Sequence, residues 1–210
     1  QGRFLMCAKY APEDTEMKEI LRIAAAISGK APQDIRTETT LAELGLSSSI
    51  KLYRLQYAIE DALGLELRPL APGFTIDFIA SMAGFSQTKY ADDINFDMAG
   101  ETPEDISPAI ESGGLFVGID IEEMAGFPKT NNYREHAFYR KVFLNEEISY
   151  ALLNQTPLQH LCGMFCAKEA MKKSAPPFLS LKMSEIKIDH EDHRPLIATT
   201  HRDLNEAYSC

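Results

Sequence analysis

The chain has 210 residues, of which 45% are hydrophobic and 25% are charged, and its formal net charge is −10. These values are ordinary for a globular protein, and the acidic balance argues against a nucleic-acid partner. The absence of an apolar run of about 18 residues argues against a membrane partner, and four cysteines without framework spacing predict a reducing, cytoplasmic setting. Because the sequence begins Gln1-Gly2-Arg3, we expect it to be a piece of a longer polypeptide.

Residues 12–86 are predicted to form an all-α helical bundle. Apolar residues recur at helical spacing over 15–28 and 49–63, and a shorter helix is expected over 75–85. Gly64 follows the second segment directly, as glycine often does at the end of a helix. Two long helices and a shorter closing one are enough for a small helical domain.

Residues 87–112 are predicted to be an acidic linker. They contain one basic and seven acidic residues, with little apolar periodicity. Such a composition favours a solvated segment. Packing of this segment against a basic surface is the alternative.

From residue 113 the pattern becomes that of an α+β domain of about 98 residues. The apolar run at 114–121 predicts a buried strand. Helices, shorter strand-like segments and a closing segment are expected in turn after it, over 146–153, 158–173, 186–188, 195–199 and 205–210.

Acidic and basic side chains at two points of this domain predict a metal and phosphate site. Asp120 ends the apolar run, Glu122 lies on the same strand face, and Glu169 lies within a helix between Lys168 and Lys173. Carboxylates are the ligands that Mg²⁺ prefers, and ammonium groups neutralise phosphate charge in a transition state. Solvated charges on an amphipathic helix are the alternative.

The segments 118–122 and 165–173 resemble the signature of the 4′-phosphopantetheinyl transferases, specifically the short holo-acyl-carrier-protein synthase type. Residues 140–147 and 192–195 extend the resemblance, which covers nearly all of 114–210. It implies an α+β fold, Mg²⁺ as cofactor, coenzyme A as substrate and an acyl carrier protein as partner. It also implies a homotrimer, in which neighbouring subunits complete each coenzyme pocket.

The resemblance further implies roles for single residues. The family's aspartate and helical glutamate, here Asp120 and Glu169, bind magnesium. Glu122 is similar to a third acidic ligand of the larger, pseudo-dimeric transferases, and Thr200 stands where the short type usually has serine. Glu169 or a metal-bound water is the general base. The residues expected on the coenzyme and phosphate side are Lys168, Lys173, Arg194 and His201.

Residues 44–50 resemble the modification loop of an acyl carrier protein, which carries 4′-phosphopantetheine on a serine. The usual motif is Leu-Gly-x-Asp-Ser-Leu, and here three serines follow the Leu-Gly pair. Counting from Gly45 places the modified residue at Ser48, whereas counting back from the end of the helix places it at Ser49. Ser49 is preferred because Ile50 would then pack inward. A serine-rich helix cap without chemistry is the alternative.

Together these features predict a carrier domain fused to its transferase, within a larger polyketide or fatty-acid type synthase. The carrier substrate is then the domain of the same or a neighbouring chain. The alternative is a catalytically degenerate transferase fold that acts as a docking module for carrier proteins.

Two further groups could be read as metal sites. Cys162 and Cys166 lie one helical turn apart near His160, but two buried thiols on an apolar helix face are the favoured interpretation. His190 and His193, with neighbouring aspartates, are interpreted as part of a solvated turn.

Overall fold

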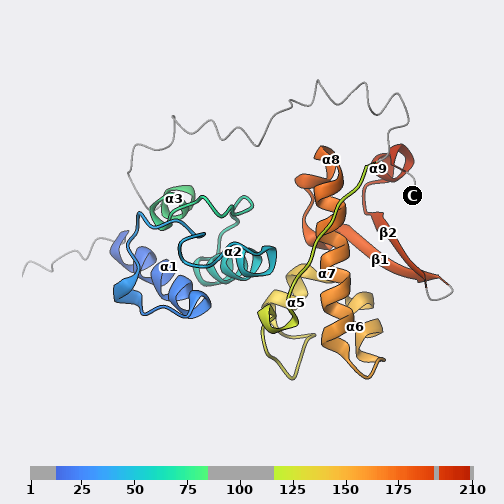
Figure 1. Ribbon diagram of the computed structural model, residues 1–210, viewed down its shortest axis with the longest axis horizontal. Coiled ribbons are helices and arrows are strands. Elements are labelled where there is room, and N and C mark those ends of the chain that lie inside the picture. The colour runs from blue at the N-terminus through green and yellow to red at the C-terminus, as the bar shows by residue number, and fades with distance from the viewer. Residues whose placement is uncertain (1–12, 85–115, 192–193, 209–210) are drawn as a thin grey trace, which may run out of the picture. The chain divides into compact units, whose positions relative to one another are not determined.

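The computed structural model describes residues 13–84, 116–191 and 194–208 (Figure 1). The chain divides into two compact units, residues 1–95 and 96–210. The division between the units, and the predicted linker 87–112, lie outside the described residues. Each unit is therefore considered by itself.

The N-terminal unit consists of helices around one apolar core. Its elements are α1 (Glu13–Ser28), the 3₁₀ turn η1 (Pro32–Asp34), α2 (Ser49–Leu63) and α3 (Ile76–Met82). The core includes Ile20, Leu41, Leu55 and Ile79, all fully buried. The three predicted helices are confirmed, and the last is shorter than expected.

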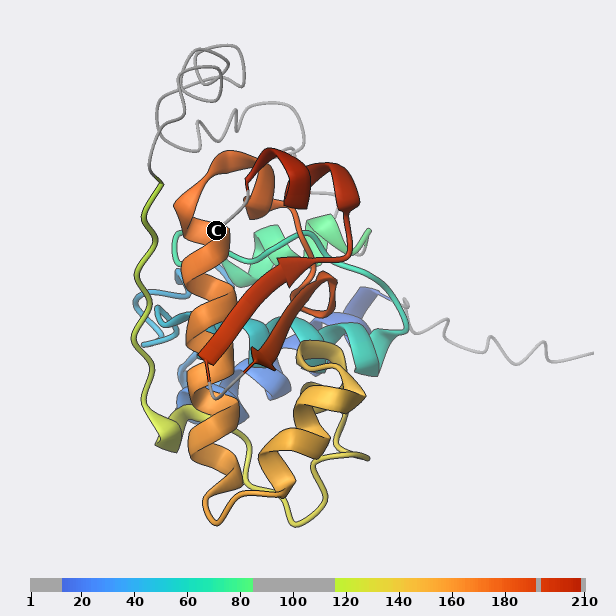
Figure 2. The ribbon, with the colours of Figure 1, turned by 90° about the vertical axis from the view of Figure 1, so that its right-hand side faces the viewer.

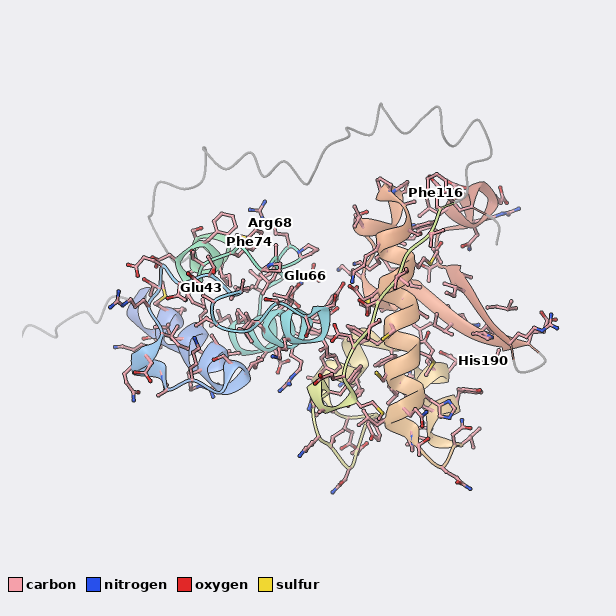
Figure 3. The ribbon with its side chains drawn as sticks, viewed as in Figure 1. Glu43, Glu66, Arg68, Phe74, Phe116 and His190 are labelled. Carbon is pink, nitrogen blue, oxygen red and sulfur yellow. The ribbon has the colours of Figure 1, made fainter. Side chains whose placement is uncertain are left out.

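Local chemistry fixes where these helices begin and end. Gly64 follows α2 with a positive φ of 67°, and its N–H donates to the carbonyl of Glu60 over 2.9 Å. The hydroxyl of Thr75 accepts from the N–H of Phe78 at the start of α3 (3.1 Å), as an N-cap residue does. Arg68 lies over the ring of Phe74, 5.7 Å from its centre (Figure 3).

The C-terminal unit is α+β, as predicted, with a small sheet of two antiparallel strands. The hairpin pairs Ile186 with Thr199 at one end and Glu191 with Arg194 at its tip. The elements of this unit are η2 (Met124–Gly126), α5 (Ala137–Val142), α6 (Asn145–Leu152), α7 (Pro157–Ser174), α8 (Pro176–Leu179), η3 (Met183–Glu185), β1 (Ile186–Glu191), β2 (Arg194–Thr199) and α9 (Arg202–Ala207).

The predicted strand at 114–121 differs from expectation. Of its described residues, 116–121 run extended along α7, apart from the β1–β2 hairpin, and pair with no described strand (Figure 2). One face of this segment lies against α7 and the other is open, so Val117, Ile119 and Ile121 are 69%, 73% and 87% exposed. The expectation of a buried strand was wrong, because an apolar run does not reveal whether anything covers its second face.

Aromatic side chains anchor the extended segment near both ends. The ring of Phe116 packs against Tyr208 with centroids 5.6 Å apart. Phe127 packs edge-on against Phe165 of α7, at 5.5 Å. The residues between these anchors are thus held along the helix. In the described part of the chain, no helix is long and apolar enough to cross a membrane.

Candidate active site

One face of α7 carries the residues of the candidate site. Cys162, Cys166, Glu169 and Lys173 follow one another at spacings of three or four residues, which places them on one side of the helix. The extended segment lies on this face. A Cβ atom added to Gly118 would lie 1.7 Å from the carbonyl oxygen of Ala170, so only glycine permits this close approach.

The structure brings together three of the predicted site residues. Lys173 Nζ lies 2.5 Å from Asp120 Oδ1 and 3.9 Å from Glu169 Oε2. Both carboxylate side chains are nearly buried, with 4% and 7% exposed, whereas the lysine side chain is 43% exposed. Lys173 therefore supplies positive charge to two carboxylates that are largely shielded from water.

Each carboxylate also keeps one oxygen without a hydrogen bond. Among the described residues, Asp120 Oδ2 and Glu169 Oε1 are buried and accept none. Buried polar atoms are normally paired, so orphaned ones call for an explanation. Two carboxylates suit a Mg²⁺ ion, which takes one or two protein ligands and completes its shell with water and phosphate oxygens. The donor set therefore fits this cation.

Glu122 is not grouped with the Asp120 and Glu169 carboxylates. Within the described ranges, no set of three or more His, Cys, Asp or Glu side chains is arranged to hold a metal ion. Glu122 contacts α7 through its backbone carbonyl, which lies 3.6 Å from the sulfur of Cys162. The structure thus assembles a pair of carboxylates and not the three suggested by the resemblance.

Lys168 lies away from this face. Its ammonium is fully buried and donates to Glu147 Oε2 (2.7 Å) and to the carbonyls of Val142 and Met183 (3.0 Å each). Burial lowers the pKa of Lys168, although the neighbouring Glu147 opposes the shift. Three protein acceptors leave the ammonium no hydrogen for a phosphate. In place of the expected phosphate contact, Lys168 joins α7 to α5, α6 and η3.

Arg194 and His201 are also separate from the carboxylates. Within the described residues, neither forms an ion pair or hydrogen bond with Asp120, Glu169 or Lys173. Arg194 is exposed at the tip of the hairpin. His201 follows β2, and its Nε2 lies 3.4 Å from Glu185. Their expected roles toward the coenzyme remain predictions.

From the sequence, the thiols of Cys162 and Cys166 were interpreted as buried groups on an apolar helix face. Cys162 is buried and Cys166 is half-buried, and both are free. Burial raises the pKa of Cys166 to about 12, and the neighbouring Cys162 and Asp120 add to the shift. Their closeness to the acidic segment was not predicted, because their spacing gave their helix face but not what covers it.

His190 is not part of a metal cluster in the described residues. Its ring stacks on Tyr150, with centroids 3.7 Å apart and an angle of 14°. Asp192 and His193 lie outside the described residues.

Comparisons with known proteins find similarity in sequence to one family of transferases. Residues 116–209 match the model of the 4′-phosphopantetheinyl transferase superfamily (ACPS). A holo-[acyl-carrier-protein] synthase of Thermus thermophilus is 33% identical over 81 residues, which are 39% of this chain and 63% of that protein. The enzyme of the same name from Thermodesulfovibrio yellowstonii is 32% identical over 72 residues, 34% of this chain and 64% of its own.

The chain thus spans less than two thirds of the length of these curated relatives. No solved structure matches the chain. The matched region contains Asp120, Glu169 and Lys173. The C-terminal unit is therefore similar in sequence to the 4′-phosphopantetheinyl transferases, over the residues that build the carboxylate site.

Proposed function

We propose that the C-terminal unit transfers 4′-phosphopantetheine from coenzyme A to a serine of an acyl carrier protein, in a Mg²⁺-dependent reaction. The observation that carries the proposal is the pair of shielded carboxylates beside Lys173, each with an orphaned oxygen. The similarity to holo-[acyl-carrier-protein] synthases supports it. Asp120 and Glu169 would hold the cation, which when bound offsets the negative charge of the pyrophosphate.

The reaction moves one phosphoryl-linked group. The serine oxygen forms a bond to the phosphorus that carries pantetheine, the bond from that phosphorus to the bridging oxygen breaks, and adenosine 3′,5′-bisphosphate leaves. The serine proton passes to Glu169 or to a water molecule. Phosphoryl transfer needs mainly positioning and charge stabilisation, and the exposed Lys173 ammonium can turn from Asp120 to a phosphate oxygen. Arg194 and His201 are proposed to contact the coenzyme.

The N-terminal helical unit is proposed to be a carrier domain. Ser49 is the first residue of α2 and Ser48 is its N-cap. The N–H groups at a helix N-terminus favour an attached phosphate. Ile50 is 1% exposed, which supports Ser49 as the modified residue because the apolar residue after it packs inward. The carrier of the same or a neighbouring chain would then be the substrate.

We also propose a homotrimer within a larger polyketide or fatty-acid type synthase. The open strip of Val117, Ile119 and Ile121 supports association, because contiguous exposed apolar surface often marks an interface. Light scattering on the full chain tests the oligomer, and a fully active monomer would refute it.

Intact-mass measurement after incubation with coenzyme A and Mg²⁺ tests the transfer. One phosphopantetheine addition is expected, and it should be lost in Ser49→Ala but retained in Ser48→Ala. With a separate carrier protein as acceptor, Asp120→Asn and Glu169→Gln should abolish transfer.

Glu146→Gln, an exposed change on α6, is the matched control and should leave the rate unchanged. Near-normal turnover of either carboxylate variant would refute the site. Binding of a carrier protein without transfer by the wild-type chain would favour a docking module instead.

A further inference from the structure

The thiols of α7 lie where the acidic segment meets the helix. Cys162, 7% exposed, directs its sulfur at the carbonyl oxygen of Glu122 over 3.6 Å, a distance suited to a weak S–H donor. One turn further along, Cys166 lies next to both Cys162 and Asp120. The pair therefore contacts the segment at Asp120 and at Glu122.

Besides its 2.5 Å ion pair with the half-exposed Lys173, few contacts fix Asp120 in place. The segment pairs with no strand in the described part of the chain, and the aromatic anchors, Phe116 and Phe127, are four and seven residues from Asp120 in sequence. Gly118 sets how closely the segment approaches α7. The contacts of the two thiols set its position at Asp120 and, beyond it, at Glu122. The separation of Asp120 from Glu169 thus depends on Gly118 and on the two thiols, as well as on Lys173, which lies near both carboxylates.

We propose that Cys162 and Cys166 are positioning residues, which hold Asp120 where its free oxygen and that of Glu169 can share one divalent cation. The inference rests on the proposed function. Neither sulfur touches the cation, because hard cations such as Mg²⁺ select oxygen ligands. Cys162 acts through its bond to the backbone of Glu122, and Cys166 acts through its contact with the Asp120 side chain. Small thiols fit this buried seam without adding a charge.

Calorimetric titration of Mn²⁺ into the full chain, without coenzyme A, tests the proposal. Cys162→Val removes the donor and adds one side-chain heavy atom, and Cys162→Ser keeps a donor. Cys166→Val places a branched side chain against Asp120. Groups that orient metal ligands typically change metal affinity by about 10–100-fold when replaced. We expect a loss in that range for both valine variants, and less than about threefold for Cys162→Ser.

Kinetics separate positioning from a general packing role. The Mg²⁺ concentration for half-maximal transfer should rise in the valine variants, while KM for coenzyme A at saturating Mg²⁺ stays the same. A lower melting temperature with unchanged Mn²⁺ affinity would overturn the proposal, as would an equal loss in Cys162→Ser and Cys162→Val. If Cys162→Val does not fold, Cys162→Ala removes the donor without added volume, and its Mn²⁺ affinity is measured in the same way.

The outcomes also distinguish this proposal from the proposed function. A wild-type chain that neither binds Mn²⁺ nor transfers phosphopantetheine would refute the function itself. A wild-type chain that does both, with valine variants that bind Mn²⁺ equally well, would refute only the role of the thiols.

Discussion

Replacing Gly118 with alanine should move Asp120, on the extended segment, away from Glu169 and Lys173 on α7. The new Cβ would lie 1.7 Å from the carbonyl oxygen of Ala170 and 3.0 Å from the backbone nitrogen of Ser174, whereas ordinary contact begins at 3.4 Å. Because both opposing atoms belong to the helix backbone, the extended segment must move outward by about 1.7 Å to restore ordinary contact. A shift of that size would break the 2.5 Å contact between Lys173 and Asp120.

A misplacement of about 1 Å at a reacting centre can cost on the order of 10²-fold in rate. We therefore expect Gly118→Ala to lower phosphopantetheine transfer by about that factor. Circular dichroism should show intact helices, because the change lies outside them, and overpacking typically costs about 1–3 kcal/mol of stability.

Gly163→Ala provides the matched control on α7. A Cβ at this position meets no atom within 4 Å, and alanine favours a helix by up to about 1 kcal/mol over glycine. Its transfer rate should be that of the wild type. A Gly118→Ala protein with the same rate and the same Mg²⁺ requirement as Gly163→Ala would refute the geometry of the site.

Three further predictions concern stability, each measured by urea unfolding. Lys168→Met leaves the buried Glu147 carboxylate without its counter-charge and should lower the free energy of unfolding by about 3–5 kcal/mol; a loss below about 1 kcal/mol would contradict a buried ion pair. Thr75→Ala removes the N-cap of α3 and should cost about 1 kcal/mol, while Thr75→Ser should cost less. Gly64→Ala forces a side chain into a backbone with φ of 67° and should cost roughly 1 kcal/mol, and an unchanged midpoint would show that the helix end relaxes.

The sequence was most informative where local patterns decide the structure. The predicted range 49–63 matches α2, because apolar spacing sets its buried face and Gly64 ends it. The predicted helix 158–173 is likewise α7 to within one residue at each end. Asp120, Glu169 and Lys173 meet as expected, although the resemblance and not the periodicity suggested this.

Contacts between distant segments were not predictable in the same way. Lys168 and Glu169 are neighbours in sequence, but adjacent helical residues point about 100° apart. Lys168 therefore enters the core while Glu169 lies under the extended segment. Which side is core depends on where α6 and η3 pack, and no local pattern reveals that. For the same reason the exposure of Ile119 and Ile121 emerged only from the fold.

The Glu147 carboxylate links segments of the C-terminal unit that should unfold locally together. Its oxygens accept from the amides of Leu144 and Ile188 (2.8 Å each), and Ile188 is 41 residues away in sequence. Lys168 of α7 is bound to the same group. Withdrawing this one side chain frees amide protons in the turn before α6 and in β1 together. Cooperative units of this kind exchange their amides as one, so Leu144 and Ile188 should show the same protection in hydrogen exchange, although neither donates to the other.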